Sequence, residues 1–259
     1  MKIKVGCCGW TYFNPNKALN LSNWKERYKH KIQAYASLFE LVEVNSTFYK
    51  IPRRSTVENW RSLVDEINPS FEFTVKSSRV ITHEDLFSGE ASLQAYYKIK
   101  EIAEALRARI ILFQTPASFR NTPENINKLR TFFSKIKRDD LVMVWEPRGS
   151  SWLNSPDTIL EICSELDLCH CVDPFKAFPR AFSSHEVGYM RLHGKPPGKE
   201  MYKYKYKDED LERLLNFVNR ICEAKEIYVL FNNIYMYEDA TRFIGYLKST
   251  TQETSNQVR

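Results

Sequence analysis

Short apolar runs alternate with longer segments of helical periodicity along almost the whole chain. The runs are six to eight residues long, rich in β-branched and aromatic residues, and often followed by proline or glycine. These features are typical of buried strands. The pattern predicts eight strands, at Ile3–Cys8, Leu41–Phe48, Phe71–Lys76, Arg109–Gln114, Leu141–Glu146, Leu168–Asp173, Val187–His193 and Glu226–Asn233.

Most of these runs are separated by segments with apolar residues at helical spacing. Ser55, Thr122 and Ser155 are residue types that favour the N-cap, and prolines follow the last two at the first helical position. A long loop is expected through Ile81–His83. The predicted helices are His30–Glu40, Ser55 to about Glu66, Ser92–Arg107, Pro123 to about Lys137, Pro156 to about Leu166, Asp208–Ala224 and Tyr237–Leu247.

Strands that alternate with helices predict parallel pairing with helical crossovers. Eight such repeats in 259 residues are typical of a closed (β/α)₈ TIM barrel, an α/β fold. An open doubly wound sheet is the competing fold, but the first strand is followed by no glycine-rich phosphate fingerprint. The chain contains no linker-like stretch. We therefore predict a single barrel domain over residues 1–248 and a polar C-terminal tail over 249–259.

Composition narrows the class of protein only moderately. The chain is 43% hydrophobic, enough for a large core, and its net charge of +6 is compatible with an anionic substrate. No apolar run resembles a signal peptide or a membrane span, so a cytoplasmic protein is the default expectation. The six cysteines lack CxxC spacing, and adjacent Cys7 and Cys8 point to opposite faces of a strand, so no structural zinc or cluster is expected.

Polar side chains gather where the predicted strands end. In a TIM barrel these ends form the mouth that carries active sites, and the starts of the strands are not comparably decorated. This asymmetry predicts a site rather than an ordinary surface. Seven of the eight strands contribute to it, with Glu43 and Asn45, Lys76, Gln114, Glu146 and Arg148, Asp173, Arg191 and His193, and Asn232 and Asn233.

The alternation of side chains along a strand supports the same prediction. Residues two apart share one face, so each pair or triplet could project into one funnel. The sets that share a face are Glu43, Asn45 and Thr47; Glu146 and Arg148; Arg191 and His193; and Cys169, Cys171 and Asp173.

These residues also carry a family resemblance across the whole chain. In order, the motifs are Gly9-Trp10, Glu43–Tyr49 with Pro52, Phe73–Lys76 with Ile81–His83, Phe113–Pro116, Trp145–Arg148 with Ser151-Trp152, Asp173-Pro174, Tyr189–Gly194 and Phe231–Asn233. The sequence resembles the YecE-like family, a domain of unknown function with a TIM-barrel fold. The resemblance implies the barrel, a motif-lined mouth and a loop at 199–207 that covers part of it. It implies no reaction.

Each candidate residue has a functional and a structural interpretation. Glu146, His193 and Asp173 are candidates for proton transfer. Alternatively, Glu146 pairs with Arg148 or Lys76, His193 binds a loop, and Asp173 makes an Asx-turn. The expected substrate-binding residues are Glu43, Asn45, Lys76, Gln114, Arg148, Arg191, Asn232 and Asn233, and the expected pocket walls are Trp10, Tyr49 and Trp152.

The first hypothesis for function is an enzyme of the hydrolase or isomerase type that acts on an anionic, phosphorylated or carboxylated substrate. Lys76, Arg148 and Arg191 would hold the anion. No cofactor is expected. A variant adds a divalent metal, whose ligands would be Glu43, His83, Glu146, Asp173 and His193.

Two further hypotheses remain open at the level of sequence. One is a nucleic-acid-binding protein or metal-dependent phosphodiesterase, because Tyr202, Tyr204 and Tyr206 alternate with lysines as in a strand that stacks bases. The plainer interpretation of that segment is a loop with packed tyrosines and solvated lysines, and it is preferred. The other hypothesis is a non-catalytic small-ligand binder. The sequence does not determine the oligomeric state.

Overall fold

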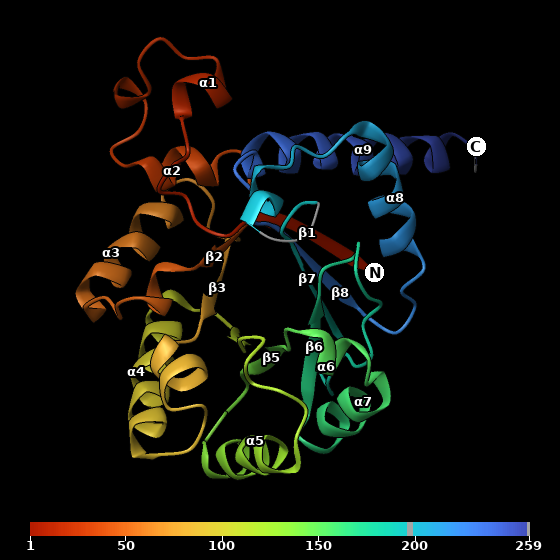
Figure 1. The fold of residues 1–259 in the computed structure, drawn as a ribbon. Coiled ribbons are helices and arrows are strands. Elements are labelled where there is room, and N and C mark those ends of the chain that lie inside the picture. The colour runs from red at the N-terminus through yellow and green to blue at the C-terminus, as the bar shows by residue number, and fades with distance from the viewer. Residues whose placement is uncertain (196–198, 258–259) are drawn as a thin grey trace.

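Eight parallel strands form a closed barrel in which each strand pairs with its neighbours in chain order. The computed structural model describes residues 1–195 and 199–257. The strands form a ring with helices around its outside (Figure 1). The predicted (β/α)₈ fold is confirmed. The strands are β1 (Lys2–Cys7), β2 (Leu41–Val44), β3 (Glu72–Lys76), β4 (Ile110–Gln114), β5 (Val142–Glu146), β6 (Leu168–Val172), β7 (Val187–Leu192) and β8 (Glu226–Phe231).

The helices begin close to where their sequence signals place them, with some exceptions. Thr122 caps its helix through a bond from the amide of Asn125, as predicted. The 54–65 helix has Arg53 rather than Ser55 as its N-cap. The described α-helices are α1 (Pro15–Leu19), α2 (Lys31–Ala36), α3 (Arg54–Asp65), α4 (Glu90–Leu106), α5 (Pro123–Lys135), α6 (Ser150–Leu153), α7 (Pro156–Glu165), α8 (Asp208–Asn219) and α9 (Met236–Gln257).

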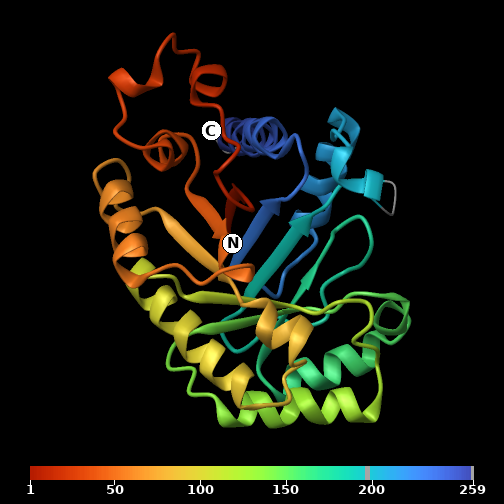
Figure 2. The ribbon, with the colours of Figure 1, turned by 60° about the vertical axis from the view of Figure 1, so that its left-hand side comes forward.

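The irregular connections differ most from the prediction. The expected loop at 81–83 is a turn of π-helix, η3 (Val80–Glu84). The expected polar tail is helical at least to Gln257, and its residues 258–259 lie outside the described part. Between β1 and β2 the chain makes an excursion that contains α1 and η1 (Trp24–Glu26) and stands apart from the ring of helices (Figure 2).

Two apolar layers account for the core. One lies between strands and helices, and the other fills the barrel. Cys7 belongs to the outer layer and Cys8 to the inner one, as the alternation predicts. All six cysteines are free thiols, and only Cys222 is exposed. The inner layer consists of Cys8, Leu41, Ile110, Leu112, Val142, Val144, Cys169, Cys171, Val187, Tyr189, Tyr228 and Leu230.

The strand starts are more polar than the sequence analysis expected. Lys4 is buried at the base of the barrel, where its ammonium binds Glu72 and, at 2.7 Å, Glu226. Tyr228 donates to Glu72 at 2.6 Å, and Arg109 pairs with Glu226 at 2.8 Å. The prediction that the strand starts carry far fewer charged residues than the strand ends was therefore wrong. We call these five residues the base cluster.

Within residues 1–195 and 199–257, no helix combines the length and the apolar character needed to cross a bilayer.

Candidate active site at the barrel mouth

A buried network of charged side chains closes the barrel interior at its mouth. Arg191, which is 1% exposed, donates from Nη2 to Glu43 Oε1 at 2.8 Å and from Nη1 to Glu146 Oε2 at 2.6 Å. Arg148 Nε donates to the other oxygen of Glu146 at 2.9 Å. The hydroxyl of Tyr189 donates a hydrogen bond of 3.0 Å to Glu43 Oε2. Arg191 thus binds both carboxylates and joins β7 to β2 and β5, which are not its neighbours in the barrel.

These contacts decide the charge state of Glu146. Burial by itself would raise the pKa of this carboxyl, but the charges of Arg148 and Arg191 outweigh it and hold the pKa well below its ordinary value. For Arg191, the desolvation that would lower its pKa is outweighed by Glu43 and Glu146, so the guanidinium stays charged. Glu146 is therefore an ionised anchor for two arginines. The structural interpretation of its pairing with Arg148 is correct.

His193 joins this network to Asp173. Its Nε2 lies 2.6 Å from Arg148 Nη2, and its Nδ1 lies 3.4 Å from Asp173 Oδ2. Because arginine can only donate, we assign Nε2 as the acceptor and place the proton on Nδ1, toward Asp173. Burial also lowers the pKa of His193. Asp173 makes its Asx-turn as well, accepting from the amide of Phe175 at 3.1 Å.

Lys76 lies near this network but forms no ion pair with its carboxylates. It is 7% exposed, and its ammonium lies 4.1 Å from the centre of the Phe48 ring. No carboxylate of the described residues comes within 4.0 Å of it. Burial, and then the charge of Arg191, lowers the pKa of Lys76 to about 8. Lys76 therefore contacts the Phe48 ring but lacks a charged partner among the described residues.

The mouth pocket lies above these groups and has a volume of about 500 Å³. This is within the size range of small-molecule sites. Four of its lining residues are cations. Its walls are Asn45, Phe48, Tyr49, Lys76, Arg79, His83, Gln114, Arg148, Arg191, Tyr202 and Asn232.

Local structure explains how the residues after β2 reach the mouth. The predicted strand Leu41–Phe48 was wrong beyond Val44, because the chain turns into the 3₁₀-helix η2 (Ser46–Phe48). Thr47 therefore does not share a strand face with Glu43. Its hydroxyl lies 2.8 Å from the carbonyl of Val44 and 2.6 Å from that of Lys76, and so joins the ends of β2 and β3.

Three predicted site residues lie elsewhere: Asn233, Trp152, and Trp10, which lines a different cavity. Asn233 donates to the carbonyl of Tyr204 at 2.8 Å and to Asp239 at 2.7 Å, so it supports a loop, whereas Asn232 lines the pocket. Trp152 is fully buried against Trp145, with ring centres 5.0 Å apart, and is not a pocket wall.

The lysine and tyrosine segment is a packed loop around the 3₁₀-helix η4 (Lys199–Lys203) rather than a base-stacking strand. Tyr204 binds Asp210 at 2.6 Å, and Tyr206 accepts from the amide of Gly194 at 2.7 Å. Only Tyr202 of the three lines the mouth pocket. The plainer interpretation is therefore confirmed for two tyrosines, while the third covers part of the mouth.

The donor set does not fit the alternative metal site. Among the residues that the structure describes, no three His, Cys, Asp or Glu side chains are grouped so that they could hold an ion. Glu43 and Glu146 already bind Arg191. His83 lies on another wall, where its Nδ1 is 2.8 Å from the Thr82 hydroxyl. Its pKa is lowered to about 4, first by burial and then by Lys76.

Sequence reasoning missed several residues that shape this region. Phe48 makes a cation–π contact with the Lys76 ammonium, and Arg79 adds a fourth cation to the pocket. Tyr189 holds Glu43 from within the barrel. Tyr189 could have been found from alternation, because it shares the inward face of β7 with Arg191.

Fold and site together define a TIM-barrel protein with a cation-rich mouth pocket. The chain belongs to the family described as "Protein of unknown function DUF72", whose model matches residues 4–259. The predicted resemblance to the YecE-like family is therefore confirmed at the level of the DUF72 family.

Relatives of this family cover nearly the whole chain. The UPF0759 protein YunF of Bacillus subtilis (strain 168) is 27% identical over 265 residues, covering 89% of this chain and 88% of its own. A DUF72 family protein from Thermotoga maritima MSB8 superimposes with a TM-score of 0.73 at 24% identity, covering 96% of this chain and 100% of its own. One from Enterococcus faecalis V583 gives 0.73 at 22% identity, with 95% of each chain covered. At these identities the structures show the shared fold alone.

Proposed function

We propose that the protein is an enzyme of the hydrolase or isomerase type that binds a small anionic substrate in the mouth pocket. The observation that carries this proposal is Lys76. It is a nearly buried ammonium, it borders the cavity, and it lacks a carboxylate partner within 4.0 Å among the described residues. Buried charges are normally paired. The missing negative charge is the one that a substrate phosphate or carboxylate supplies.

The neighbouring arginines strengthen this assignment. Arg148 and Arg191 border the same cavity, and their shared carboxylate Glu146 fixes both guanidinium planes. Glu43 and Glu146 bind Arg191 and Arg148, whereas Lys76 has no carboxylate within 4.0 Å among the described residues. An anion that enters meets positively charged groups that are already oriented, which reduces the cost of ordering them on binding.

The same geometry suggests how protons would move. Glu146 is poorly suited as a base because its oxygens accept from Arg191 and Arg148. Lys76 is better suited, since a pKa of about 8 lets its Nζ gain or lose a proton near neutral pH. We place proton transfer on Lys76, while His193 would hold Arg148 through Nε2. Asp173 would orient the His193 ring, and Glu146 would hold the arginines.

The alternative of a metal-dependent phosphodiesterase finds less support in the donor set. Its two central carboxylates, Glu43 and Glu146, are both bound to the buried Arg191. A cation placed between them would also lie near Arg148 and Lys76, which repel it. The mouth therefore favours an anion over a divalent metal.

Binding of the anion is tested by calorimetry with inorganic phosphate and ribose 5-phosphate. Lys76→Met should weaken binding of both about tenfold or more, because a charge-assisted hydrogen bond contributes about 1.5–3 kcal/mol. Lys50→Met is the matched control, since Lys50 is exposed close to the pocket and outside its lining. Equal losses in the two variants, or no binding by the wild type, would contradict the proposal.

Turnover is tested separately, because a non-catalytic binder would pass the first experiment. Sugar phosphates and phosphate esters are incubated with the enzyme in D2O and followed by proton and phosphorus NMR. An isomerase incorporates deuterium at carbon, and a hydrolase releases phosphate. Lys76→Met should abolish either signal. Binding without any turnover across the panel would identify a ligand-binding protein instead.

A further inference from the structure

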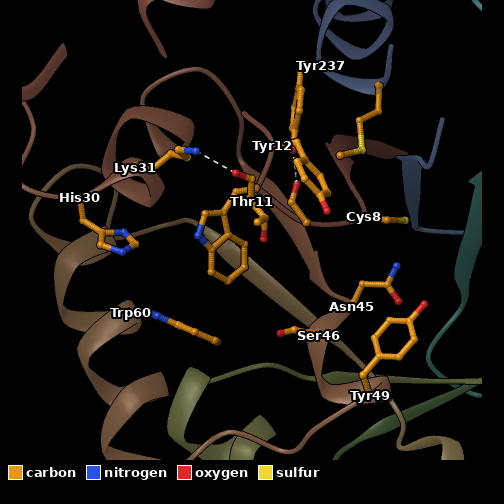
Figure 3. Close-up of a pocket in the computed structure, with 13 residues that line it drawn as sticks. Cys8, Thr11, Tyr12, His30, Lys31, Asn45, Ser46, Tyr49, Trp60 and Tyr237 are labelled. Atoms are coloured by element: carbon orange, nitrogen blue, oxygen red, sulfur yellow. Dashed lines mark hydrogen bonds between the residues drawn. The ribbon is translucent and has the colours of Figure 1, made fainter. Parts of the chain in front are cut away.

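A second cavity, which we call the ring pocket, adjoins the mouth pocket. It has a volume of about 630 Å³, and Figure 3 shows its lining. Asn45 and Tyr49 line both pockets, so the two cavities are neighbours across one shared wall. The ring pocket is lined by Cys8, Gly9, Trp10, Thr11, Tyr12, His30, Lys31, Asn45, Ser46, Tyr49, Trp60, Met236 and Tyr237.

Aromatic side chains dominate the walls of the ring pocket. Trp10 and Trp60 meet edge to face, with ring centres 5.0 Å apart and planes at 86°. Trp60 projects from α3 on one side, while Asn45 and Tyr49 approach from the opposite side (Figure 3). Tyr49 is 76% exposed and makes its nearest ring contact with Phe48. Trp10 and Trp60 are half-buried, and partly accessible aromatic rings around a cavity suit the stacking of a flat ring.

The two pockets differ sharply in charge. Lys31 is the one lysine or arginine among the lining residues of the ring pocket, and its ammonium is engaged by the carbonyl of Thr11 at 2.8 Å. Burial, and then Lys31, lowers the pKa of His30, which favours its neutral form. The mouth pocket, in contrast, contains four cations. A ligand that spans both pockets would have a neutral ring at one end and an anionic group at the other.

The shared wall contains an unsatisfied polar group. Asn45 Oδ1 is buried and has no hydrogen-bond partner in the described structure. Such orphan acceptors are uncommon in folded proteins and call for an explanation. Because this oxygen has almost no accessible surface, a ligand donor between the two pockets would reach it after rotation of the Asn45 side chain.

We propose that the two pockets together bind a nucleoside monophosphate, with the base in the ring pocket and the phosphate in the mouth pocket. The phosphate half of this assignment rests on the proposed function. The base half rests on independent residues, chiefly Trp10, Trp60 and Tyr49. A sugar phosphate would fill the mouth pocket and leave the aromatic walls unused.

The experiment compares ligands that differ only in the base. Binding of AMP, GMP, CMP, UMP and ribose 5-phosphate is measured by calorimetry. At least one nucleotide should bind about tenfold tighter than ribose 5-phosphate, because stacking of a base on an aromatic side chain is a substantial contribution. If all four nucleotides bind no tighter than ribose 5-phosphate, the proposal is overturned.

Variants then locate the base. Trp60→Leu should weaken nucleotide binding about tenfold and leave ribose 5-phosphate binding unchanged. Trp24→Leu is the control, since Trp24 lies outside both pockets. Tyr49→Ser, at an exposed position, keeps the test available if Trp60→Leu does not fold. If neither pocket variant weakens nucleotide binding, the ring pocket is not the base site.

The outcomes separate this proposal from the proposed function. If ribose 5-phosphate and inorganic phosphate bind while the base adds nothing, only the nucleotide assignment fails. If no phosphate compound binds, the anion site fails as well. If a ten-nucleotide single strand binds much tighter than any mononucleotide and its affinity falls steeply with salt, the surface belongs to nucleic acid, and the free-nucleotide assignment is overturned.

Discussion

Both ends of the barrel contain a network of ion pairs, but they differ in whether each cation contacts a carboxylate. At the base, Lys4 and Arg109 face Glu72 and Glu226, so two cations match two carboxylates. At the mouth, Glu43 and Glu146 bind Arg191 and Arg148, while Lys76 has no carboxylate within 4.0 Å among the described residues. Polar residues at strand ends therefore do not identify a site by themselves. At the mouth, the stronger indication is a buried cation that borders a cavity and has no carboxylate in contact with it among the described residues.

Solvent access is the second difference. The carboxylates of the base cluster retain contact with water, with side chains 27% exposed at Glu72 and 21% at Glu226. At the mouth, Glu43 is fully buried and the side chain of Glu146 is 7% exposed. A partner lost at the base can be replaced by water, whereas one lost at the mouth leaves a buried charge unpaired. The following predictions use matched pairs from the two ends.

The largest difference is expected for the central cations. Arg191→Met should lower the free energy of unfolding by about 3–5 kcal/mol, because it leaves two buried carboxylates without their main partner. Lys4→Met should cost about 1–2 kcal/mol, since Arg109 and Tyr228 still hold the base carboxylates. Urea denaturation of both variants measures the difference. Equal losses would show that the two networks are energetically alike.

The tyrosines of the two networks provide a smaller contrast. Tyr189→Phe should lower the free energy of unfolding by about 1–3 kcal/mol, because it leaves Glu43 Oε2 and the Thr74 hydroxyl without their bonds of 3.0 and 2.8 Å. Tyr228→Phe removes its bond to the hydrated Glu72 and the bond that it accepts from Lys4 at 3.1 Å, but Lys4 keeps both carboxylates, so the cost should be about 0.5–1.5 kcal/mol. Thermal and urea unfolding provide the test, and a reversed order would contradict the role given to burial.

Ligand binding should depend on pH at the mouth and not at the base. Protonated Lys76 attracts the anion, and with a pKa of about 8 it loses that charge above this pH. Affinity for ribose 5-phosphate should therefore fall with rising pH, approaching about tenfold per pH unit above pH 8. Lys76→Arg should move the fall to higher pH, and Lys4→Met should leave the profile unchanged. A flat profile in the wild type would remove Lys76 from the binding site.

The smallest effects are expected for the outer arginines. Arg79 at the mouth and Arg109 at the base have side chains 50% and 45% exposed, so replacing either with methionine should change the free energy of unfolding by about 0.5 kcal/mol or less. Arg79→Met should nevertheless weaken phosphate binding about twofold to threefold through its field at the pocket. Arg109→Met should not. Calorimetry and denaturation of the same two proteins distinguish these outcomes.

The sequence predicted the barrel well because each level of the pattern agrees with the others. All eight strands were found, and their ends were displaced mainly where the chain leaves the sheet. The predicted strand extended too far beyond Val44, because Thr47, Phe48 and Tyr49 are typical strand residues. Tertiary bonds from Thr47 to the ends of two strands override that local preference and form η2 instead.

The site was predicted in part for an equally physical reason. Alternation along β7 brought Arg191 and His193 together, and alternation along β8 could have separated Asn232, which lines the pocket, from Asn233, which does not. No local pattern could show that Lys76 lacks a partner, because that depends on which distant carboxylates are already bound. The ring pocket could not be predicted for the same reason, because it joins residues of α2, η2, α3 and α9 with the loop that follows β1.

Because five of the six cysteines are buried, the reactivity of their thiols can report local opening of the structure. Burial raises the pKa of Cys8, Cys169 and Cys171 inside the barrel, and it raises that of Cys163 in the outer layer to about 12. Thiolates are the reactive species, so an alkylating reagent should modify exposed Cys222 at once and the buried thiols only when their layer opens. Mass spectrometry of the labelled peptides would then give separate opening rates for the outer layer and for the barrel interior.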